Sequence, residues 1–408
     1  MSFALIFLLL FSPGTQAEEL PALSLSVDQA VELACRQNPA LQALEREIET
    51  ARGQARIDSA LPDAELGLEV AGLNFSGTGT VEQETSLGLS QAVPFPGKLR
   101  LRARAGRLAE EEAALKLERA RILLASEVRK AYYRSLLQQR TVEILLKNLE
   151  LLEDIQKNAI SRYALAAVPY SDILRVRLEM ARTRNDLLEA RKELVISFQE
   201  LRRLLGLKED LELVLTSGFE AREPYPQLDE MLTRKKELSP TLRLARLRQN
   251  RAELLVRLAA RGRFPDFSFG FYSPSKKLGA AGFSFGLSYP LFTRKRLTGE
   301  KIQAEAERQK AGFEIQAAER FFESRTRQVA AEIIQSQEQI NIFEASLLQD
   351  SRAELDKALQ DYRLGKLDSL SLMDLYRSFS LVSLEYYRAI YLYQAALAEF
   401  LVAGENYE

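Results

Sequence analysis

Few of the residue types that enzymes use for catalysis occur in this 408-residue chain. It contains no histidine, which excludes Ser-His-Asp and Cys-His catalysis and any imidazole metal site. Cys35 is the only cysteine, so neither an internal disulfide nor a thiolate zinc cluster can form. Residues 96–99 (PGKL) lack the first glycine and the Ser or Thr of a phosphate-binding loop. The acidic residues are scattered along helical patterns, which gives little support to an enzyme with paired carboxylates. We therefore expect no enzymatic activity, no cofactor and no bound metal.

The charge balance and the first residues bear on location and partners. The formal net charge is −1, which argues against nucleic-acid binding by charge alone. Residues 1–17 have the layout of a signal peptide: an apolar run over 3–11 is broken by Pro13 and Gly14, and Ala17 ends a small-residue cleavage pattern. No later stretch approaches the roughly 18 unbroken apolar residues of a membrane helix. If the exported chain enters a membrane, it must therefore do so with strands.

The chain repeats itself once. Residues 162–163 (RY) correspond to 361–362 (DY), and 205–206 (LG) correspond to 403–404 (AG), with offsets close to 200 residues. Such a period is too long for a solenoid and indicates a duplicated half. We expect a first repeat over 18–206, a linker over 207–227, a second repeat over 228–404 and a tail over 405–408.

Each repeat is expected to contain a strand pair, over about 64–92 and about 266–290. Apolar and small or polar residues alternate there, and the aromatic side of the second pair comprises Phe267, Phe269, Phe283 and Phe285. Strands of about ten residues with this alternation suit a membrane barrel with a wet lumen, in which these phenylalanines would face lipid. A half-buried soluble sheet gives the same alternation, so the strands alone leave both possibilities open.

Long helical patterns without proline fill most of the remaining sequence. They extend over about 97–161 and about 296–361, and each would be ~100 Å long. Four shorter helices are expected over about 28–58, 170–205, 228–262 and 368–402. In each half the two short helices, stacked end to end, match the long one, and tight turns near residues 163 and 363 fold the chain back. The predicted fold is mixed but mainly α, with the strand pairs at one end.

Four strands cannot close a barrel, because the smallest membrane barrels have about eight. The strands would therefore have to be pooled among two, three or four protomers. An exported coiled-coil scaffold or adhesin is the alternative: it explains the helices and the signal, but it leaves the phenylalanine-rich strand pairs without a purpose.

These features together resemble the TolC family of outer-membrane efflux proteins, over nearly all of the exported chain. The resemblance rests on the signal, the duplication, the order strand pair–long helix–turn–short helix and the prolines at each strand-to-helix junction. Residues 91–99 (QAVPFPGKL) resemble the junction of the CzcC-like metal-efflux group, and 362–365 (YRLG) resemble the helix-tip turns of the family. Two departures are Ala166, where glycine is common, and an extra residue before Leu372.

The resemblance implies a homotrimer in the outer membrane of a Gram-negative bacterium. Twelve strands would form a β-barrel, and the helices would continue it as a hollow α-helical barrel through the periplasm. The assembly would be a passive exit duct for metal ions or small toxic compounds. An inner-membrane pump of the RND type would supply energy, and a periplasmic adaptor would join pump and duct. The segment 208–227 would belong to an equatorial collar.

The resemblance also assigns roles to residues near the helix tips. Asp172 and Asp374 match gate acids, and Asp368 is a third candidate. In a trimer each would form a ring of three carboxylates that repel one another and hold cations. Structural roles compete with this one, because Asp368 fits a helix N-cap and Asp172 lies in a first helical turn. The residues expected to meet the adaptor, unless they are merely solvated, are Arg162, Tyr163, Tyr362, Arg363, Gly365 and Lys366.

Overall fold

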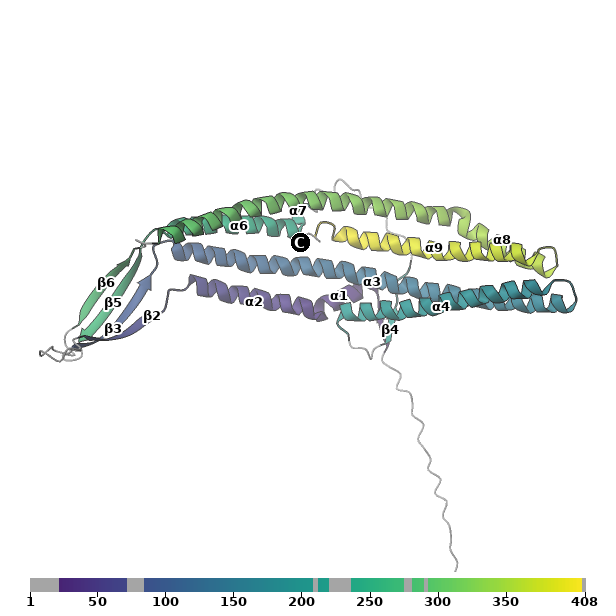
Figure 1. The fold of residues 1–408 in the computed structure, drawn as a ribbon, viewed down its shortest axis with the longest axis horizontal. Coiled ribbons are helices and arrows are strands. Elements are labelled where there is room, and N and C mark those ends of the chain that lie inside the picture. Colours follow the sequence, from purple (N-terminus) through teal and green to yellow (C-terminus); the bar gives the residue numbers. More distant parts are fainter. Residues whose placement is uncertain are drawn as a thin grey trace, which may run out of the picture.

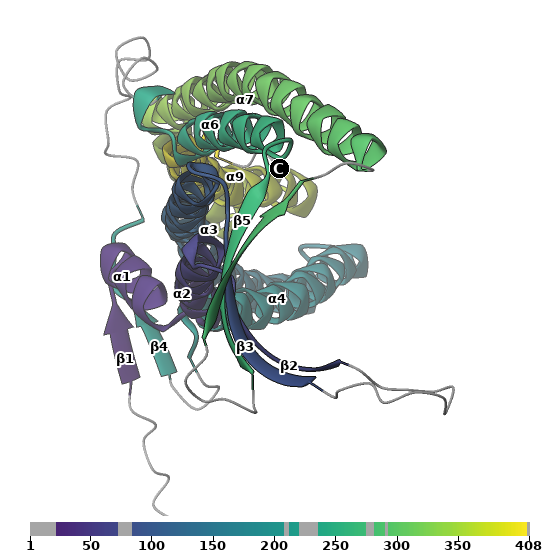
Figure 2. The ribbon, with the colours of Figure 1, turned by 90° about the vertical axis from the view of Figure 1, so that its left-hand side faces the viewer.

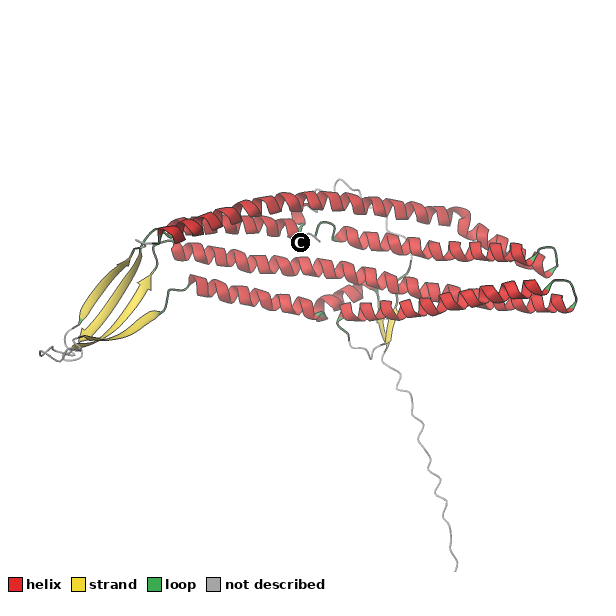
Figure 3. Cartoon of the chain, viewed as in Figure 1, coloured by secondary structure: helices red, strands yellow, loops and turns green. Residues whose placement is uncertain are grey.

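The structure is a computed structural model, which describes residues 22–71, 84–207, 212–219, 236–274, 281–289 and 293–405. It is mainly helical, with strands at one end and beside the middle of the molecule (Figure 3). The predicted signal peptide and most of the predicted linker lie outside the described residues. Within the described ranges, no helix combines the length and the apolar character needed to cross a membrane.

The elements follow one another in the order expected for two repeats. They are β1 (Ala22–Leu25), α1 (Val27–Gln37), α2 (Pro39–Ser59), β2 (Ala64–Ala71), β3 (Glu84–Val93), α3 (Lys98–Ala164), α4 (Tyr170–Leu205), β4 (Glu212–Leu215), α6 (Pro240–Arg261), β5 (Asp266–Pro274), β6 (Gly282–Ser288), α7 (Arg294–Ile342), the π-helix η1 (Phe343–Leu347), α8 (Leu348–Arg363) and α9 (Ser369–Leu401).

Four elements lie side by side at each level along the molecule (Figure 1). The sheet has the order β2-β3-β5-β6, the adjoining helices have the order α2-α3-α6-α7, and the distal helices have the order α4-α3-α9-α8. Seen along the long axis, the helices form an arc, and α1, β1 and β4 lie on its outer side (Figure 2). The two repeats therefore build one curved wall, four elements wide.

Some helices differ from the sequence expectation. The helix expected over about 28–58 is two helices, because Pro39 begins α2 and the Asn38 side chain caps it by accepting the Ala40 N–H at 2.9 Å. Proline also sets the start of α6: Pro240 is its first residue, and Ser239 accepts the Leu242 N–H at 3.3 Å. The second long helix is interrupted by η1, whereas α3 is one helix of 67 residues. A π-turn accommodates one residue more than an α-turn, so the halves differ here.

Packing is also uneven between the two long helices. No residue between 341 and 354 is buried, whereas the corresponding part of α3 buries Leu145, Asn148 and Leu152. We call residues 341–354 the unpacked stretch, although Phe343 within it packs, partly buried, against the large central core cluster. The stretch separates this cluster, which ends on α7 at Ile340, from a smaller cluster that begins on α8 at Leu355.

The sheet keeps its apolar and polar residues on opposite faces. In the antiparallel register Leu66, Leu89, Phe271 and Phe283 form one row, and Glu65, Ser90, Gly270 and Ser284 form the next. Phe269, Phe271, Phe283 and Phe285 are exposed in the single chain. One face of the sheet is therefore an exposed apolar surface.

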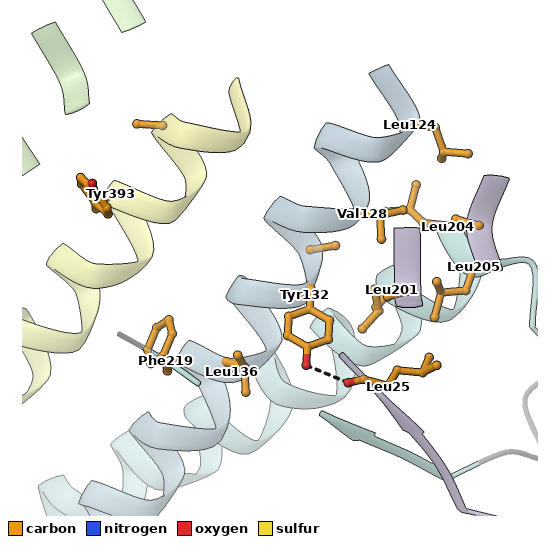
Figure 4. Packing of buried hydrophobic residues seen from close by; sticks show 14 of the residues in the cluster. Leu25, Leu124, Val128, Tyr132, Leu136, Leu201, Leu204, Leu205, Phe219 and Tyr393 are labelled. Carbon is orange, nitrogen blue, oxygen red and sulfur yellow. Dashed lines mark hydrogen bonds between the residues drawn. The ribbon is translucent and has the colours of Figure 1, made fainter. Parts of the chain in front are cut away.

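The short parallel pair β1–β4 is fixed to the helical wall by a buried tyrosine. The Tyr132 hydroxyl of α3 donates to the Leu25 carbonyl at 2.8 Å (Figure 4). It also accepts the Ser217 N–H at 2.9 Å. Tyr132 is fully buried, so the hydrogen bond to Leu25 forms away from water, and the one from Ser217 is partly shielded from it. This one hydroxyl ties the N-terminal strand, the β4 segment and the wall together.

Residues 91–99 form a joint between the two repeats. Lys98 Nζ donates to the Asp266 carboxylate at 2.8 Å and to the Phe264 carbonyl at 2.9 Å. The same carboxylate oxygen accepts the Phe95 N–H at 2.7 Å, and the Phe95 ring stacks on Phe264 with centroids 4.6 Å apart. Gly97 has φ 89°, which only glycine adopts without strain, and the helix begins directly after it. The motif therefore fixes the sheet-to-helix junction of the first repeat, between β3 and α3, against the helix-to-sheet junction of the second, between α6 and β5.

Candidate gate at the helix tips

The distal end of the wall is made of two helix hairpins, α3–α4 and α8–α9. Their turns, residues 165–169 and 364–368, are equal in length. In the first turn the Ala167 N–H donates to the Arg162 carbonyl at 2.9 Å, and in the second the Lys366 N–H donates to the Asp361 carbonyl at 2.8 Å. A left-handed residue ends each helix: Ala166 with φ 53° and Gly365 with φ 78°. The two tips therefore share one turn geometry, with a strained residue in the first.

An apolar cluster holds the two hairpins together. We call it the tip cluster, and its buried members are Leu152, Ile155, Val176, Met180, Leu355, Ala358, Tyr362, Leu372, Met373 and Tyr376. These residues come from α3, α4, α8 and α9. Separating the hairpins would expose this surface to water, so the cluster favours the docked state.

Polar contacts cross the same boundary. Arg377 of α9 donates two hydrogen bonds to the Glu179 carboxylate of α4, at 2.7 and 3.2 Å. Arg162 Nη1 donates to the Tyr362 carbonyl at 2.8 Å, and its guanidinium lies 4.9 Å from the centre of the Tyr362 ring. Hydrogen bonds to charged groups are stronger than neutral ones, so these contacts add both stability and register. We call the Glu179–Arg377 contact the tip ion pair.

The structure places the three predicted acids in different surroundings. The Asp374 side chain is 64% exposed, with Arg377 Nη1 at 3.6 Å. Asp172 is only 7% exposed, with Arg175 Nη1 at 3.4 Å. Asp368 is the N-cap of α9 and accepts the Ser371 N–H at 3.4 Å. Hydrogen bonds from Ser371 hold the pKa of the Asp368 carboxyl below its usual value.

The six residues expected at the adaptor also divide into two groups. Arg162 is turned onto the second tip, and Tyr362 is 1% exposed beneath it. Tyr163, Arg363, Gly365 and Lys366 are at the surface of the tips. Burial raises the pKa of the Tyr362 hydroxyl, as expected for a residue that packs inside the tip.

Sequence reasoning missed the residues that join the hairpins. Glu179 lies between Val176 and Met180 on the buried face of α4, and Thr183 follows one turn later, 3.4 Å from the Tyr376 hydroxyl. Polar residues at positions that should be apolar were the available signal. No group of three or more Asp, Glu or Cys side chains arranged to hold a metal ion occurs in the described residues.

A curved wall whose sheet has two free edges, and whose helices end in paired tips, defines one segment of a membrane channel with a helical extension. The family model for outer membrane efflux protein matches residues 30–207 and 232–402. The chain belongs to this family.

Solved structures support the fold. The chain is similar to the CmeC outer membrane channel of Campylobacter jejuni, at 17% identity and a TM-score of 0.79, covering 94% of this chain and 86% of that one. It is similar to CusC at 20% identity and a TM-score of 0.78, covering 93% and 91%. It is similar to the outer membrane protein VceC of Vibrio cholerae at 19% identity and a TM-score of 0.75, covering 93% and 97%. A search of curated protein sequences found no significant match.

Family membership fixes the general activity. The protein is a non-enzymatic outer-membrane efflux channel of the kind used in tripartite systems. It is located in the outer membrane of a Gram-negative bacterium and extends into the periplasm. Family members work as trimers with periplasmic adaptors and inner-membrane pumps.

Proposed function

We propose that three copies of this chain close into a tube that conducts metal ions or small toxic compounds out of the cell. The observation that carries the proposal is that the wall has two different free edges. One edge is β2, α2 and α4, and the other is β6, α7 and α8. Because the two edges differ, one edge of each copy would contact the other edge of the next copy, in a head-to-tail arrangement. When the rotation between successive copies divides a full circle, the copies close into a ring. Three four-stranded sheets then supply twelve strands.

Both helical edges carry exposed apolar side chains that suit such a contact. On α4 they include Leu174, Leu178, Leu188 and Val195, and on α7 they include Ile334. Apolar surface of this kind favours burial against a neighbouring copy. In the sheet, the row of Phe269 and Phe285 would face lipid, together with Phe267 and Phe283, and the Ser and Gly row would face the lumen.

The concave side of the wall becomes the bore of the tube. On α9, Tyr387 marks the outer side, because its ring stacks on Phe219 of the β4 segment with centroids 5.9 Å apart. A helix turns about 100° per residue. Asp374 lies thirteen residues before Tyr387, which is three full turns and about 220°, so it points away from the outer side. Its exposed carboxylate would form a ring of three charges in the bore, close to the tips. Asp172 and Asp368, which are tied to their own helices, would contribute less to the gate.

Opening the tube requires the two hairpins of each chain to separate at the tip cluster. The tip ion pair and the Arg162 contact resist that separation. An adaptor that binds the exposed residues Tyr163, Arg363, Gly365 and Lys366 would change this balance, and an inner-membrane pump of the RND type would load the opened tube. Which cargo reaches the duct is then decided by the pump.

Purified protein in planar bilayers tests the proposal. The expected result is an outer-membrane protein that migrates as a heat-modifiable trimer, has the mass of three chains and conducts ions. A folded, monodisperse monomer without conductance would contradict the proposal and favour an exported scaffold or adhesin.

A further inference from the structure

A groove runs along the wall between α7, η1 and α9, and the gate does not use it. It consists of two adjoining hollows of about 410 and 330 Å³, which share Gln339 and Leu392 in their linings. The larger hollow also contacts Phe343 and Leu347 of η1, and the smaller one contacts Ala395 and Ala396 of α9. A volume of this size suits a drug-sized molecule.

The groove opens on the concave side of the wall. On α9, Leu392 is five residues after Tyr387, which faces the β4 segment on the outer side, so Leu392 points away from that side. On α3, Lys130 lines the groove, and Tyr132, two residues later, contacts Ser217 of the β4 segment on the outer side. Two residues correspond to about 200° around a helix, so Lys130 points to the opposite, concave side. Two helices therefore independently place the groove on the side that becomes the bore.

The lining is apolar at the centre, and its charges are already paired. Ile342 is 63% exposed and Leu392 is 45% exposed, although both lie in the groove. At one end, Glu399 accepts hydrogen bonds from Lys130 at 2.7 Å and from Arg325 at 3.0 Å. At the other end, Arg388 and Glu385 pair with each other at 3.4 Å.

We propose that this groove is a binding site in the duct wall for uncharged apolar organic solutes. The apolar centre would gain free energy by covering its exposed side chains, and the Gln339 amide offers a hydrogen bond to a single polar group. An ion gains little there, because the neighbouring charges already have partners. The inference rests on the proposed function, because only a closed tube turns the concave side into a bore.

Cysteine protection in the assembled trimer tests the site. The Leu392→Cys variant is made in a Cys35→Ala background, reconstituted in nanodiscs and treated with a membrane-impermeant methanethiosulfonate. The probe solute is N-phenyl-1-naphthylamine. At about ten times its dissociation constant, the modification rate should fall about tenfold by mass action. Leu381→Cys is the matched control: it lies eleven residues earlier, on the same face of α9, and outside the groove lining, so its rate should not change.

The outcomes separate the groove from the duct. The trimer could conduct ions and yet show unchanged modification rates at both positions, or equal protection at both. Either result would refute the binding site in the groove and leave the proposed duct intact. No modification at either position, together with absent conductance, would overturn the duct itself. Protection at position 392 alone supports the proposal.

Discussion

Breaking the tip ion pair should open the channel. Arg377 donates two hydrogen bonds to a Glu179 side chain that is 10% exposed, whereas the arginine itself is 45% exposed. A fully buried pair broken on one side costs roughly 3–5 kcal/mol, and an exposed pair costs about 0–1 kcal/mol. Because Arg377 is exposed, the free-energy cost of breaking this contact should lie between these two values. In addition, Arg182 lies 3.5 Å from the same carboxylate and partly replaces the lost partner.

For Arg377→Ala we therefore expect a loss of about 1–2 kcal/mol in the docking of the two hairpins. Three equivalent tips act in one trimer, and each 1.4 kcal/mol changes an equilibrium about tenfold. The open fraction of unliganded channels in planar bilayers should rise at least about fivefold. Glu179→Gln should have a similar effect, and the double variant should add little, because both changes remove the same contact.

Arg388→Ala is the matched control. Arg388 lies on the same helix and pairs with Glu385 three residues earlier, so its loss removes an ion pair without touching the boundary between the hairpins. If Arg377→Ala conducts like the wild type, or if Arg388→Ala opens the channel equally well, the tip ion pair does not hold the gate.

Four further predictions concern other parts of the wall. Phe285→Lys should cost roughly 2–4 kcal/mol at the bilayer midplane and reduce trimer assembly measured on gels, whereas Ser284→Lys should assemble normally and alter conductance. Asp374→Ala should lower cation selectivity and divalent block in bilayer recordings, whereas Asp368→Ala should cost about 1 kcal/mol of local helix stability and leave conductance alone; the reverse pattern would exchange their roles. Ala166→Gly should stabilise the first tip by about 0.5 kcal/mol, and Gly365→Ala should destabilise the second by about 1 kcal/mol; hydrogen exchange at the two turns would show the opposite signs. Tyr132→Phe should lower the free energy of unfolding, measured in denaturant melts, by about 1–3 kcal/mol, because the Ser217 N–H loses its buried acceptor. An unchanged midpoint would show that the hydroxyl does not stabilise the fold.

The architecture of the chain could be predicted because its signals are long and periodic. The duplication, the two long helical patterns and the alternating phenylalanines each extend over many residues, so local exceptions do not hide them. Pro39 and Pro240 were visible in the sequence, yet the helix boundaries beside them were misplaced, because a helical pattern continues on both sides of each proline.

The contacts between the hairpins could not be predicted. Glu179 and Arg377 are 198 residues apart, and only the register of the folded tips brings them together. The π-helix is equally hidden, because its sequence, residues 343–347, has no proline or glycine to mark it. Residues 91–99 were noticed for their resemblance to metal-efflux members, and in the structure they hold the two repeats together through hydrogen bonds and ring stacking.

The unpacked stretch has a consequence for how the two repeats have diverged. A residue inserted into a helix rotates everything beyond it, and a tightly packed helix cannot absorb that rotation. Between residues 341 and 354 no side chain is fully buried, and Phe343 packs only partly buried against the central core cluster, so an extra residue is tolerated there as a π-turn. Natural selection against insertions should therefore be weakest in this window, and length differences among descendants of the duplicated gene should accumulate there rather than in α3.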